Sequence, residues 1–365
     1  MKLLLITNFA SHYRSAIYQL IDKEFGADFV FGDKVGDIKP MNYQMLTHQV
    51  SIVHNVSMGC GYYQQGVLKN LVKDYDTYLM AGEFRCISTW LMLLCLRLMP
   101  RKRSYLWTHG WLGKERGYKR MLTFLFFWLA DGVFVYNRRS RNLMIEGGIP
   151  SRKVITLFNS LNYDLQLSLR KTLCSSELYH HHFANDRNVI IFVGRLTKIK
   201  RLDLVLEAMS LCKKQGEIYN FVLVGDGEAR ASLEALTIDL KLKGQVWFYG
   251  ACYDEYQLAQ LIYNADLCVS PGNIGLTAIH VLMFGCPAIT NNDFDHQMPE
   301  FEAIKPGKTG DFFESDNPKA LADVIVRWLR TNHNRREVIR KICYEEVDNY
   351  WNPHFQLGVI RKTII

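Results

Sequence analysis

The sequence predicts an α/β protein built from two Rossmann-like domains that face each other across a cleft. Two observations carry this prediction. Short apolar runs alternate with helical segments, and this alternation stops near residue 159 and restarts near residue 188. Alternating strands and helices predict a parallel sheet with helices on both faces. The length of 365 residues exceeds one ordinary hydrophobic core and fits two domains.

The first domain is predicted over residues 1–165. Its strands are expected at residues 2–7, 28–31, 77–80, 104–108, 132–136 and 153–157, and its helices at 15–24, 87–98, 119–129 and 140–146. The opening residues MKLLLITNF lack a long apolar region and a small-residue cleavage site. We therefore interpret them as a buried strand and not as a signal peptide.

A polar segment without clear periodicity, residues 166–187, is predicted to be a linker. The second domain is predicted over 188–335, beginning with the apolar run at 189–193. The remaining residues, 336–365, are expected to form a helical tail that packs back on the first domain. The histidine run at 180–182 in the linker has no partner ligand at a suitable spacing, so no metal site is predicted.

Charge is distributed unevenly along the chain. The net charge is +8, and residues 1–165 contain 21 Lys/Arg against 12 Asp/Glu. Eight basic residues lie within positions 97–120, interleaved with Leu98, Met99, Tyr105, Trp107, Trp111 and Leu112. We expect this region to attract an anionic partner, and an anionic membrane surface is one candidate. No nucleic-acid-binding motif accompanies the charge, so a nucleic-acid partner is not expected.

Cysteine use and hydropathy indicate a cytoplasmic protein. The nine cysteines form no C-x-x-C pair, and several stand inside apolar runs, which is typical of reduced, buried thiols. The longest apolar stretches, 90–96 and 121–130, are much shorter than the ~20 residues that span a bilayer. Any membrane attachment is therefore expected to be peripheral, on the cytoplasmic face.

Cations and a flexible turn follow two predicted strands of the second domain. Gly194 ends the first of these strands, and Arg195 and Lys200 follow it. Two cations near a strand-end glycine suit a diphosphate, although solvated loop charges are the alternative interpretation. The turn contains Gly272, Asn273, Ile274, Gly275 and Leu276. Backbone amides at the start of the following helix would point at an anion.

Two histidines are further candidates. His280 lies one turn inside the helix that follows the flexible turn, and a hydrogen-bonded core histidine is the alternative interpretation. His109 follows a predicted strand of the first domain, where a side chain would face the cleft. The segment Gly225-Asp226-Gly227 is interpreted as a tight strand–helix turn, with a phosphate loop as the weaker alternative.

The ordered series of motifs resembles the retaining "group 1" (family four type) glycosyltransferases of the GT-B fold, common in bacterial polysaccharide biosynthesis. The series is Gly194-Arg195-Leu196, Lys200, Gly225-Asp226-Gly227, Phe248-Tyr249-Gly250, Ala265-Asp266, Ser270-Pro271, Gly275-Leu276, Gly285-x-Pro287 and Gly307-x-Thr309-Gly310. Ala130-Asp131-Gly132, Gly148-x-Pro150 and Asn159-Ser160 match the pattern that precedes the linker. The resemblance covers residues 105–330 well and 1–104 loosely.

The resemblance implies a hexosyl transfer from a nucleoside-diphosphate sugar to a glycan or lipid-linked acceptor, with retention of anomeric configuration. Arg195 and Lys200 would hold the diphosphate, and the turn at 272–276 would contact sugar and phosphates. Gly250, Cys252 and Tyr253 would border the base, and His109 would approach the donor sugar. No cofactor and no obligatory metal ion are expected, since no Asp-rich motif stands beside the site.

The chain departs from the family at two positions. The family carries two glutamates eight positions apart, and here those positions hold Gly272 and His280. His280 could still hydrogen-bond ribose hydroxyls, whereas Gly272 has no side chain for sugar hydroxyls and Asn273 is the nearest substitute. Two other functions therefore stay open: a sugar-nucleotide epimerase of the same fold and a non-catalytic sugar-nucleotide-binding protein. The sequence leaves the base, sugar, acceptor, linkage and oligomeric state undetermined.

Overall fold

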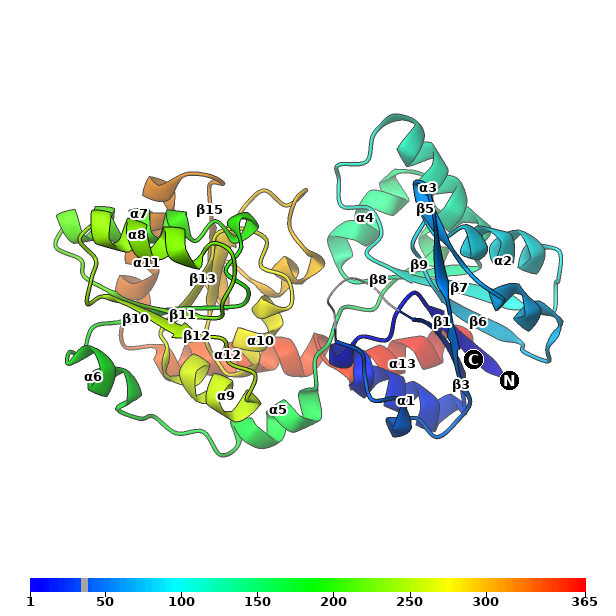
Figure 1. Cartoon of the computed structure of the whole chain (residues 1–365), viewed down its shortest axis with the longest axis horizontal. Helices are drawn as coiled ribbons and strands as arrows, with labels where there is room; N and C mark the ends of the chain where they lie inside the picture. The colour runs from blue at the N-terminus through cyan, green and yellow to red at the C-terminus, as the bar shows by residue number, and fades with distance from the viewer. Residues whose placement is uncertain (34–38) are drawn as a thin grey trace. The chain divides into compact units, whose positions relative to one another are not determined.

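A computed structural model describes residues 1–33 and 39–365, and the chain divides into two compact units. The first unit comprises Met1–Asn162 together with Asn352–Ile365, and the second comprises Tyr163–Trp351. Each unit is built around its own parallel sheet (Figure 1). The α/β class and the two Rossmann-like sheets predicted from the sequence are confirmed.

The first unit contains a seven-stranded sheet in the order β3-β2-β1-β6-β7-β8-β9, in which every pair is parallel. The strands are β1 (Leu3–Thr7), β2 (Asp28–Gly32), β3 (Val50–Val53), β6 (Thr77–Ala81), β7 (Arg103–Thr108), β8 (Gly132–Val135) and β9 (Val154–Thr156). A separate antiparallel hairpin joins β4 (Asn55–Met58) and β5 (Gly61–Gln64). The sheet strands are near-continuous apolar runs because both faces are covered.

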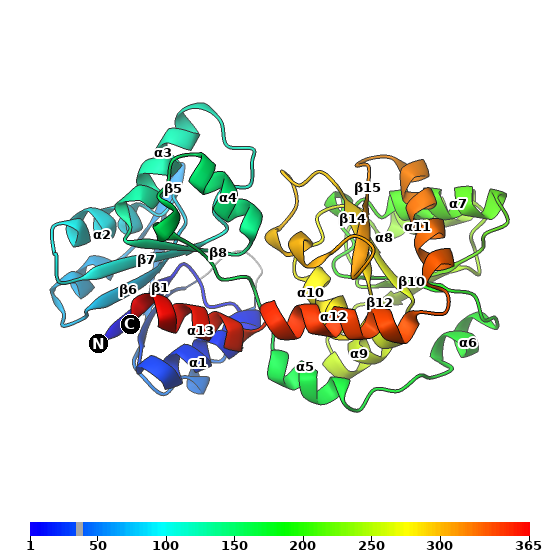
Figure 2. The same cartoon turned by 180° about the vertical axis from the view of Figure 1, so that it is seen from behind.

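Alternate residues of a strand pack into the two hydrophobic cores on opposite faces of the sheet. Leu3 and Leu5 pack with α1 (Ser15–Phe25) and α13 (Pro353–Ile364), whereas Leu4 and Ile6 pack with the helices of the opposite face. Those helices are η3 (Val67–Val72), α2 (Ile87–Arg97), α3 (Gly117–Leu129) and α4 (Arg138–Glu146). Both views show α13 lying beside α1 (Figure 2). Short 3₁₀ turns occupy η1 (His12–Arg14), η2 (Tyr43–Met45) and η4 (Ser151–Lys153).

The second unit contains a six-stranded parallel sheet in the order β12-β11-β10-β13-β14-β15. Its strands are β10 (Val189–Val193), β11 (Asn220–Val224), β12 (Val246–Gly250), β13 (Leu267–Ser270), β14 (Ala288–Asn291) and β15 (Gly310–Phe313). The first strand lies in the middle, and the chain builds outward from it in both directions. This order places a topological switch point between β10 and β13.

Helices cover both faces of this second sheet. One face carries α6 (Leu178–Phe183), α9 (Glu255–Asn264) and α10 (Thr277–Met283), whose apolar side chains share a core with alternate strand residues. The other face carries α7 (Asp203–Lys214), α8 (Arg230–Asp239) and α11 (Pro318–Asn332) (Figure 1). The remaining helical elements are α5 (Tyr163–Arg170), η5 (Lys198–Lys200), η6 (Pro299–Ala303) and α12 (Arg336–Tyr350).

Several segments differ from the simple pattern that we predicted. The segment 166–187, predicted as a linker, includes most of α5 and all of α6, and it groups with the second unit. The predicted tail, 336–365, contains α12 in the second unit and α13 in the first. Strands β3, β4, β5 and β15 were not predicted. Among the described residues, no helix is both long enough and apolar enough to cross a bilayer.

Candidate functional site

The candidate donor residues gather at the carboxyl edge of the second unit's sheet. Gly194 follows β10, Gly250 ends β12, and the turn at 272–276 follows β13. Because all six strands are parallel, these loops emerge at the same edge. The loops after β10 and β13 flank the switch point, where α/β sheets of this kind bind ligands. Here the fold brings to one edge the candidates that lie in the second unit; His109 belongs to the first unit.

Lys200 is anchored to the turn that follows β13. Its ammonium donates hydrogen bonds to the backbone oxygen of Asn273 at 2.6 Å and to Asn273 Oδ1 at 2.8 Å. Burial, together with the nearby charge of Arg195, lowers the pKa of Lys200 to about 8. An anion bound beside this amine would stabilise its charged form and raise the pKa again.

Arg195 differs from Lys200 in its surroundings. Its side chain is exposed, whereas Lys200 is partly buried. The loop that carries it is held by its neighbour Leu196, whose amide donates to Asp226 O at 2.9 Å and whose carbonyl accepts from Ala229 N at 2.9 Å. The turn Gly225-Asp226-Gly227 thus braces the Arg195 loop from the adjacent strand end, as expected of a tight structural turn.

Gly272 approaches the Lys200 loop so closely that only glycine fits. A Cβ atom at this position would collide with the carbonyl oxygen of Ile199 and lie 2.8 Å from Lys200 Cα. The Gly272 amide donates to Lys200 O at 3.0 Å. A glutamate therefore cannot replace Gly272 without a shift of the backbone. The absence of the family's glutamate at this position is therefore explained by the close contact between the two loops.

Gln297, which the sequence analysis missed, fixes the same turn from the other side. Its side chain is 1% exposed, its Nε2 donates to Gly272 O at 3.1 Å, and its Oε1 accepts from Ile274 N at 3.0 Å. Thr290 and Asn291 also donate to Gly272 O, at 3.1 and 3.2 Å. Strand β14 and the segment between it and η6 thus supply a polar support for the turn.

The amides of the turn serve two purposes. Those of Gly272 and Ile274 are bonded within the protein, to Lys200 and Gln297. Within residues 1–33 and 39–365, no acceptor lies in hydrogen-bond range of the amides of Asn273, Gly275 or Leu276. Part of the predicted phosphate-binding amide set is therefore engaged structurally, and the remainder is open to a ligand.

His280 lies on α10 and contacts a carboxylate from α9. Its Nε2 is 2.9 Å from Glu255 Oε1, which also accepts from Gln166 Nε2 at 2.8 Å. Burial opposes ionisation of Glu255, but the hydrogen bonds from His280 and Gln166 outweigh it and lower its pKa. The position where the family carries a glutamate thus holds a histidine that is paired with a glutamate.

The residues predicted to border the nucleotide base lie after β12. Gly250 adopts a φ of +93°, which favours glycine. Cys252 Sγ lies 3.7 Å from Asp254 O and from Gln257 Oε1, and the Tyr253 side chain is almost fully exposed. An exposed aromatic beside a strand end could stack on a base, so the geometry is compatible with the predicted role.

His109 belongs to the first unit and follows β7. Its ring lies 4.9 Å from that of Tyr136, and Tyr136 accepts a hydrogen bond from Arg14. The His109 side chain is exposed, but nearby protein atoms and the charge of Arg14 lower its pKa below the usual value. His109 is therefore neutral near pH 7 and can both donate and accept hydrogen bonds.

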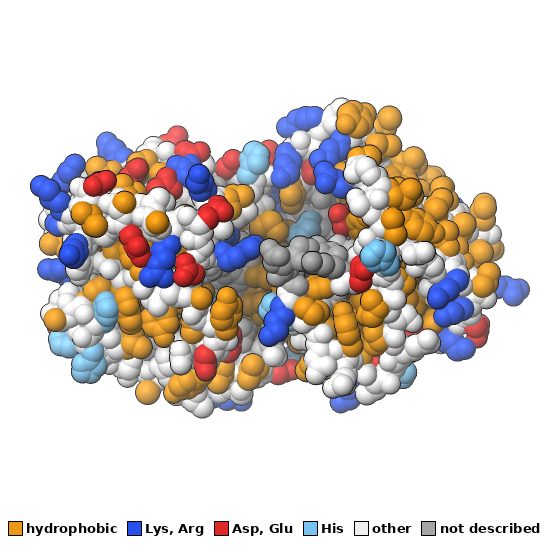
Figure 3. Space-filling view, viewed as in Figure 1, with side chains coloured by type: hydrophobic (Ala, Val, Ile, Leu, Met, Phe, Trp, Pro, Cys, Tyr) orange, Lys and Arg blue, Asp and Glu red, His pale blue; other side chains and the backbone are white. Residues whose placement is uncertain are grey.

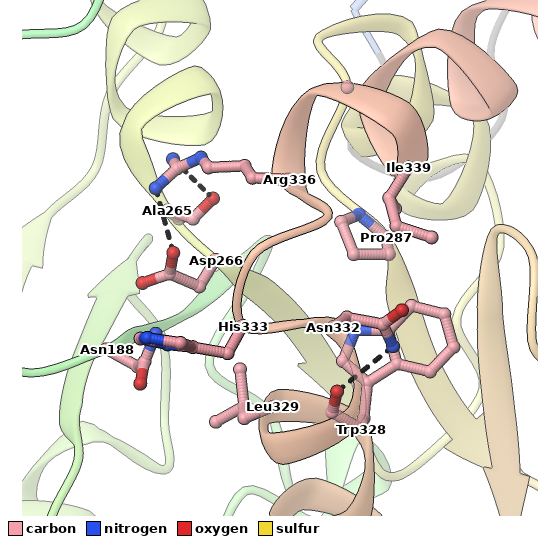
Figure 4. Close-up of a pocket in the computed structure, with 11 residues that line it drawn as sticks. Asn188, Ala265, Asp266, Pro287, Trp328, Leu329, Asn332, His333, Arg336 and Ile339 are labelled. Atoms are coloured by element: carbon pink, nitrogen blue, oxygen red, sulfur yellow. Dashed lines mark hydrogen bonds and ion pairs between the residues drawn. The ribbon is translucent and has the colours of Figure 1, made fainter.

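A separate pocket of about 190 Å³ lies elsewhere in the second unit (Figure 4). Its lining residues Asn188, Asp266 and Pro287 directly precede β10, β13 and β14, so it lies at the amino edge of the sheet. Arg336 spans it, donating to Asp266 Oδ1 at 2.8 Å and Ala265 O at 3.1 Å. We interpret this pocket as a structural feature of the packing of α11 and α12 against the starts of these strands.

In the described part of the chain, no three His, Cys, Asp or Glu side chains gather so as to hold a metal ion. The histidines at 180–182 lie on α6, where His180 pairs with Asp186 and the His182 ring stacks on Trp247 with 3.7 Å between centroids.

Comparison with known proteins decides the family. Residues 179–345 match the family model described as "Glycosyl transferases group 1". The second unit belongs to this family. The match spans all the donor-site candidates and lies within one unit, whereas the similar motifs at 130–160 fall outside it.

Curated relatives of this group 1 glycosyltransferase domain are distant. One is the GDP-mannose-dependent alpha-(1-6)-phosphatidylinositol dimannoside mannosyltransferase of Mycobacterium tuberculosis, 27% identical over 166 residues, or 44% of this chain and 40% of the relative. Another is an undecaprenol-linked glycan alpha-1,4-N-acetyl-D-galactosaminyltransferase of Campylobacter jejuni, 26% identical over 176 residues, or 48% of each chain. The chain spans about half the length, or less, of the curated relatives it matches.

Solved structures resemble the whole chain. HepE of Anabaena, in complex with UDP, matches with a TM-score of 0.72 at 15% identity, covering 100% of this chain and 99% of the other. The lipopolysaccharide outer core galactosyltransferase WaaB matches with a TM-score of 0.72 at 14% identity, with the same coverage. These likenesses establish the GT-B fold.

Proposed function

We propose that the chain is a glycosyltransferase that moves a hexose from a nucleoside-diphosphate sugar to a glycan or lipid-linked acceptor, with retention of configuration, in cell-surface polysaccharide synthesis. The observation that carries the proposal is the anchored ammonium of Lys200 at the switch point of a group 1 domain. HepE, of similar fold, has been solved with UDP and with UDP-glucose, which supports a nucleotide-sugar donor here.

The proposed chemistry follows from the charge that develops as the sugar leaves. Cleavage of the bond to the β-phosphate builds negative charge on that phosphate, and fixed cations stabilise it. Lys200 would supply the positioned charge, and the exposed Arg195 would close on the diphosphate from the adjacent loop. Since two cations are available there, we propose that transfer needs no obligatory divalent metal ion, and turnover should persist in EDTA.

The test begins with purified protein and a panel of UDP- and GDP-linked hexoses. Consumption of one donor, with a new glycoside formed only when an acceptor is present, would support transfer. A changed sugar on the nucleotide without acceptor would indicate the epimerase alternative. Binding of donor without any turnover, under all acceptor conditions, would indicate a non-catalytic binding protein.

A pair of matched variants tests the assigned cation. Lys200→Ala should lower turnover by about two orders of magnitude, the typical effect of losing one stabilising donor. Lys198→Ala removes the same charge from an exposed position two residues earlier and should retain turnover. Equal turnover in the two variants would contradict the role of Lys200.

A further inference from the structure

Helix α2 in the first unit is apolar on two opposite faces. Its inner face buries Met92, Leu93 and Leu96 in the core. Its outer face exposes Ile87, Leu91 and Leu94, and the stripe continues to Leu98, with exposed fractions of 49% at Leu94 and 83% at Leu98. A surface helix is ordinarily polar on its outer face, so this outer stripe is not required by the core.

Helix α3 repeats this pattern beside α2. Its inner face buries Phe126, Phe127 and Leu129. Its outer face exposes Tyr118, Met121, Leu122, Leu125 and Trp128, with exposed fractions of 78% at Tyr118 and 67% at Met121. We call the exposed apolar residues of the two helices, with Leu98, the α2–α3 surface.

The two stripes form one continuous surface. The rings of Trp90 on α2 and Phe126 on α3 lie 4.9 Å apart, and Arg97 lies 5.5 Å over the ring of Trp128. Figure 3 shows hydrophobic side chains gathered over these helices, with basic side chains on the flanks. An exposed patch of this kind marks an interaction site more often than a chance arrangement.

A groove of about 570 Å³ opens in the α2–α3 surface near the start of both helices. Its walls are mainly apolar, and two cations, Arg85 and Lys119, are among its lining residues. Both approach the same ring: Lys119 Nζ lies 5.7 Å and Arg85 Cζ 6.0 Å from the centroid of Phe84. The groove therefore combines a hydrocarbon-like floor with positive charge, the combination that an anionic amphiphile requires.

The charge around the surface is mainly positive, although the carboxylate of Asp131, two residues after α3, lies 3.9 Å from the guanidinium of Arg97. Neither α2 nor α3 contains an acidic residue. Exposed basic residues lie in the terminal turns of the helices or beyond them: Arg85, Lys114, Arg116 and Lys119 near the helix starts, and Arg97, Arg101 and Arg103 near the helix ends. Lys102 is not among them, since its ammonium donates to Lys73 O and Tyr75 O, each at 2.8 Å.

The aromatic residues that we expected to accompany these cations at the surface are buried. Trp107 is 5% exposed and Trp111 3% exposed, because β7 and the segment after it pack into the cores of the first unit. That part of the sequence prediction was wrong. The apolar component of the surface comes from α2 and α3 instead.

We propose that the α2–α3 surface attaches the first unit to an anionic lipid bilayer. The apolar stripes would enter the region between headgroups and acyl chains, to a depth of about 5–10 Å. Tyr118 and Trp128 suit the headgroup level, where such amphipathic rings accumulate. The flanking cations would bind anionic headgroups, each strengthening attachment roughly fivefold.

A second copy of this chain is the less suitable occupant. A twofold interface would bring the same patch together on both sides and set the two groups of cations against each other. Like charges across an interface oppose association, whereas anionic headgroups complement them. The proposal does not rest on glycosyl transfer, since it concerns a surface that contains none of the donor-site residues.

Flotation with lipid vesicles tests the proposal on the full chain. Wild-type protein should float with vesicles that contain phosphatidylglycerol, float less with pure phosphatidylcholine, and detach as salt rises. The double variant Leu94→Asp with Met121→Asp should lose flotation. Ile238→Asp, at a position 64% exposed on α8 of the second unit, is the matched control and should float like wild type.

Charge neutralisation separates the electrostatic component. Arg85→Gln together with Lys119→Gln should weaken binding to the anionic vesicles by roughly tenfold or more. Circular dichroism and retained UDP or GDP binding would show that the variants are folded, and both are independent of transferase turnover.

Three outcomes would overturn the proposal. The first is no flotation of wild type on anionic vesicles at low salt. The second is flotation that is unchanged in the variant with Asp at 94 and 121. The third is a wild-type protein that is dimeric in solution and a double variant that is monomeric, with no vesicle binding by either protein. That result would assign the surface to a second copy of the chain. Failure of the proposed transfer reaction would change none of these readouts.

Discussion

Nucleoside diphosphate binding should weaken as Lys200 loses its proton. The lowering of its pKa from 10.5 to about 8 means that the empty site disfavours the ammonium by at most about 3 kcal/mol. The β-phosphate of a bound nucleotide would reverse that penalty, so the affinity should follow the protonated fraction of the amine. UDP and GDP are fully ionised above pH 7, since the relevant phosphate pKa is about 6.

The expected size follows from the titration. At pH 7 nearly all Lys200 side chains are charged, whereas at pH 9 roughly one in ten is, so affinity should fall about tenfold.

The same pKa shift predicts how Lys200 changes the free energy of unfolding with pH. Between pH 8 and 10.5 the unfolded chain retains a proton that the folded chain has released, so rising pH favours the folded state.

Calorimetric titration with UDP and with GDP at pH 7, 8 and 9 measures the effect. Lys200→Arg keeps its charge throughout this range and should show a flat profile, which controls for any other group that titrates between pH 7 and 9. Lys200→Met should bind weakly at every pH. A flat profile in wild type, or a tenfold fall that persists in Lys200→Arg, would refute the role assigned to Lys200.

Two further variants test the support of the turn, and a third tests the pair formed by His280 and Glu255. Gly272→Ala should lower UDP or GDP affinity, because the new Cβ collides with Ile199 and shifts the loop that carries the ammonium; unchanged affinity would contradict the close contact. Gln297→Leu should lower the free energy of unfolding in urea by about 1–3 kcal/mol, since it leaves the buried Ile274 amide without its acceptor. His280→Ala should weaken nucleotide binding and raise the pKa of Glu255, which an NMR titration measures. If nucleotide affinity is unchanged, the pair formed by His280 and Glu255 has only a structural role.

The sequence was sufficient to locate the donor-site candidates of the second unit because strand ends are local features. A buried apolar run that stops at Gly194 marks the carboxyl edge of a strand without any tertiary information. The same reasoning placed Asn273 and Lys200 at one edge, and the parallel sheet then brought them into direct contact. What remained hidden was the hydrogen bond itself, which depends on how two loops fold against each other.

Gln297 could not be found in this way. It lies in an irregular segment between β14 and η6, where no periodicity shows which side chains turn inward. The pairing of His280 with Glu255 joins residues 25 positions apart on two helices, and no spacing rule connects them. Similarly, Leu91 and Leu94 stand in an apolar run that reads as core, and only the packed structure shows which residues face outward.

The departure from the family pattern at Gly272 is part of one coherent arrangement. Loss of a side chain at Gly272 permits the Lys200 loop to close against the turn, and that closure places the ammonium on Asn273. The carbonyl of Gly272 then receives three side-chain donors, including Gln297, which holds the turn in this position. A glutamate restored at 272 alone would therefore break contacts on both sides of the turn. We therefore propose that the turn is a rebuilt anion-binding site and not a family site that has merely lost a carboxylate.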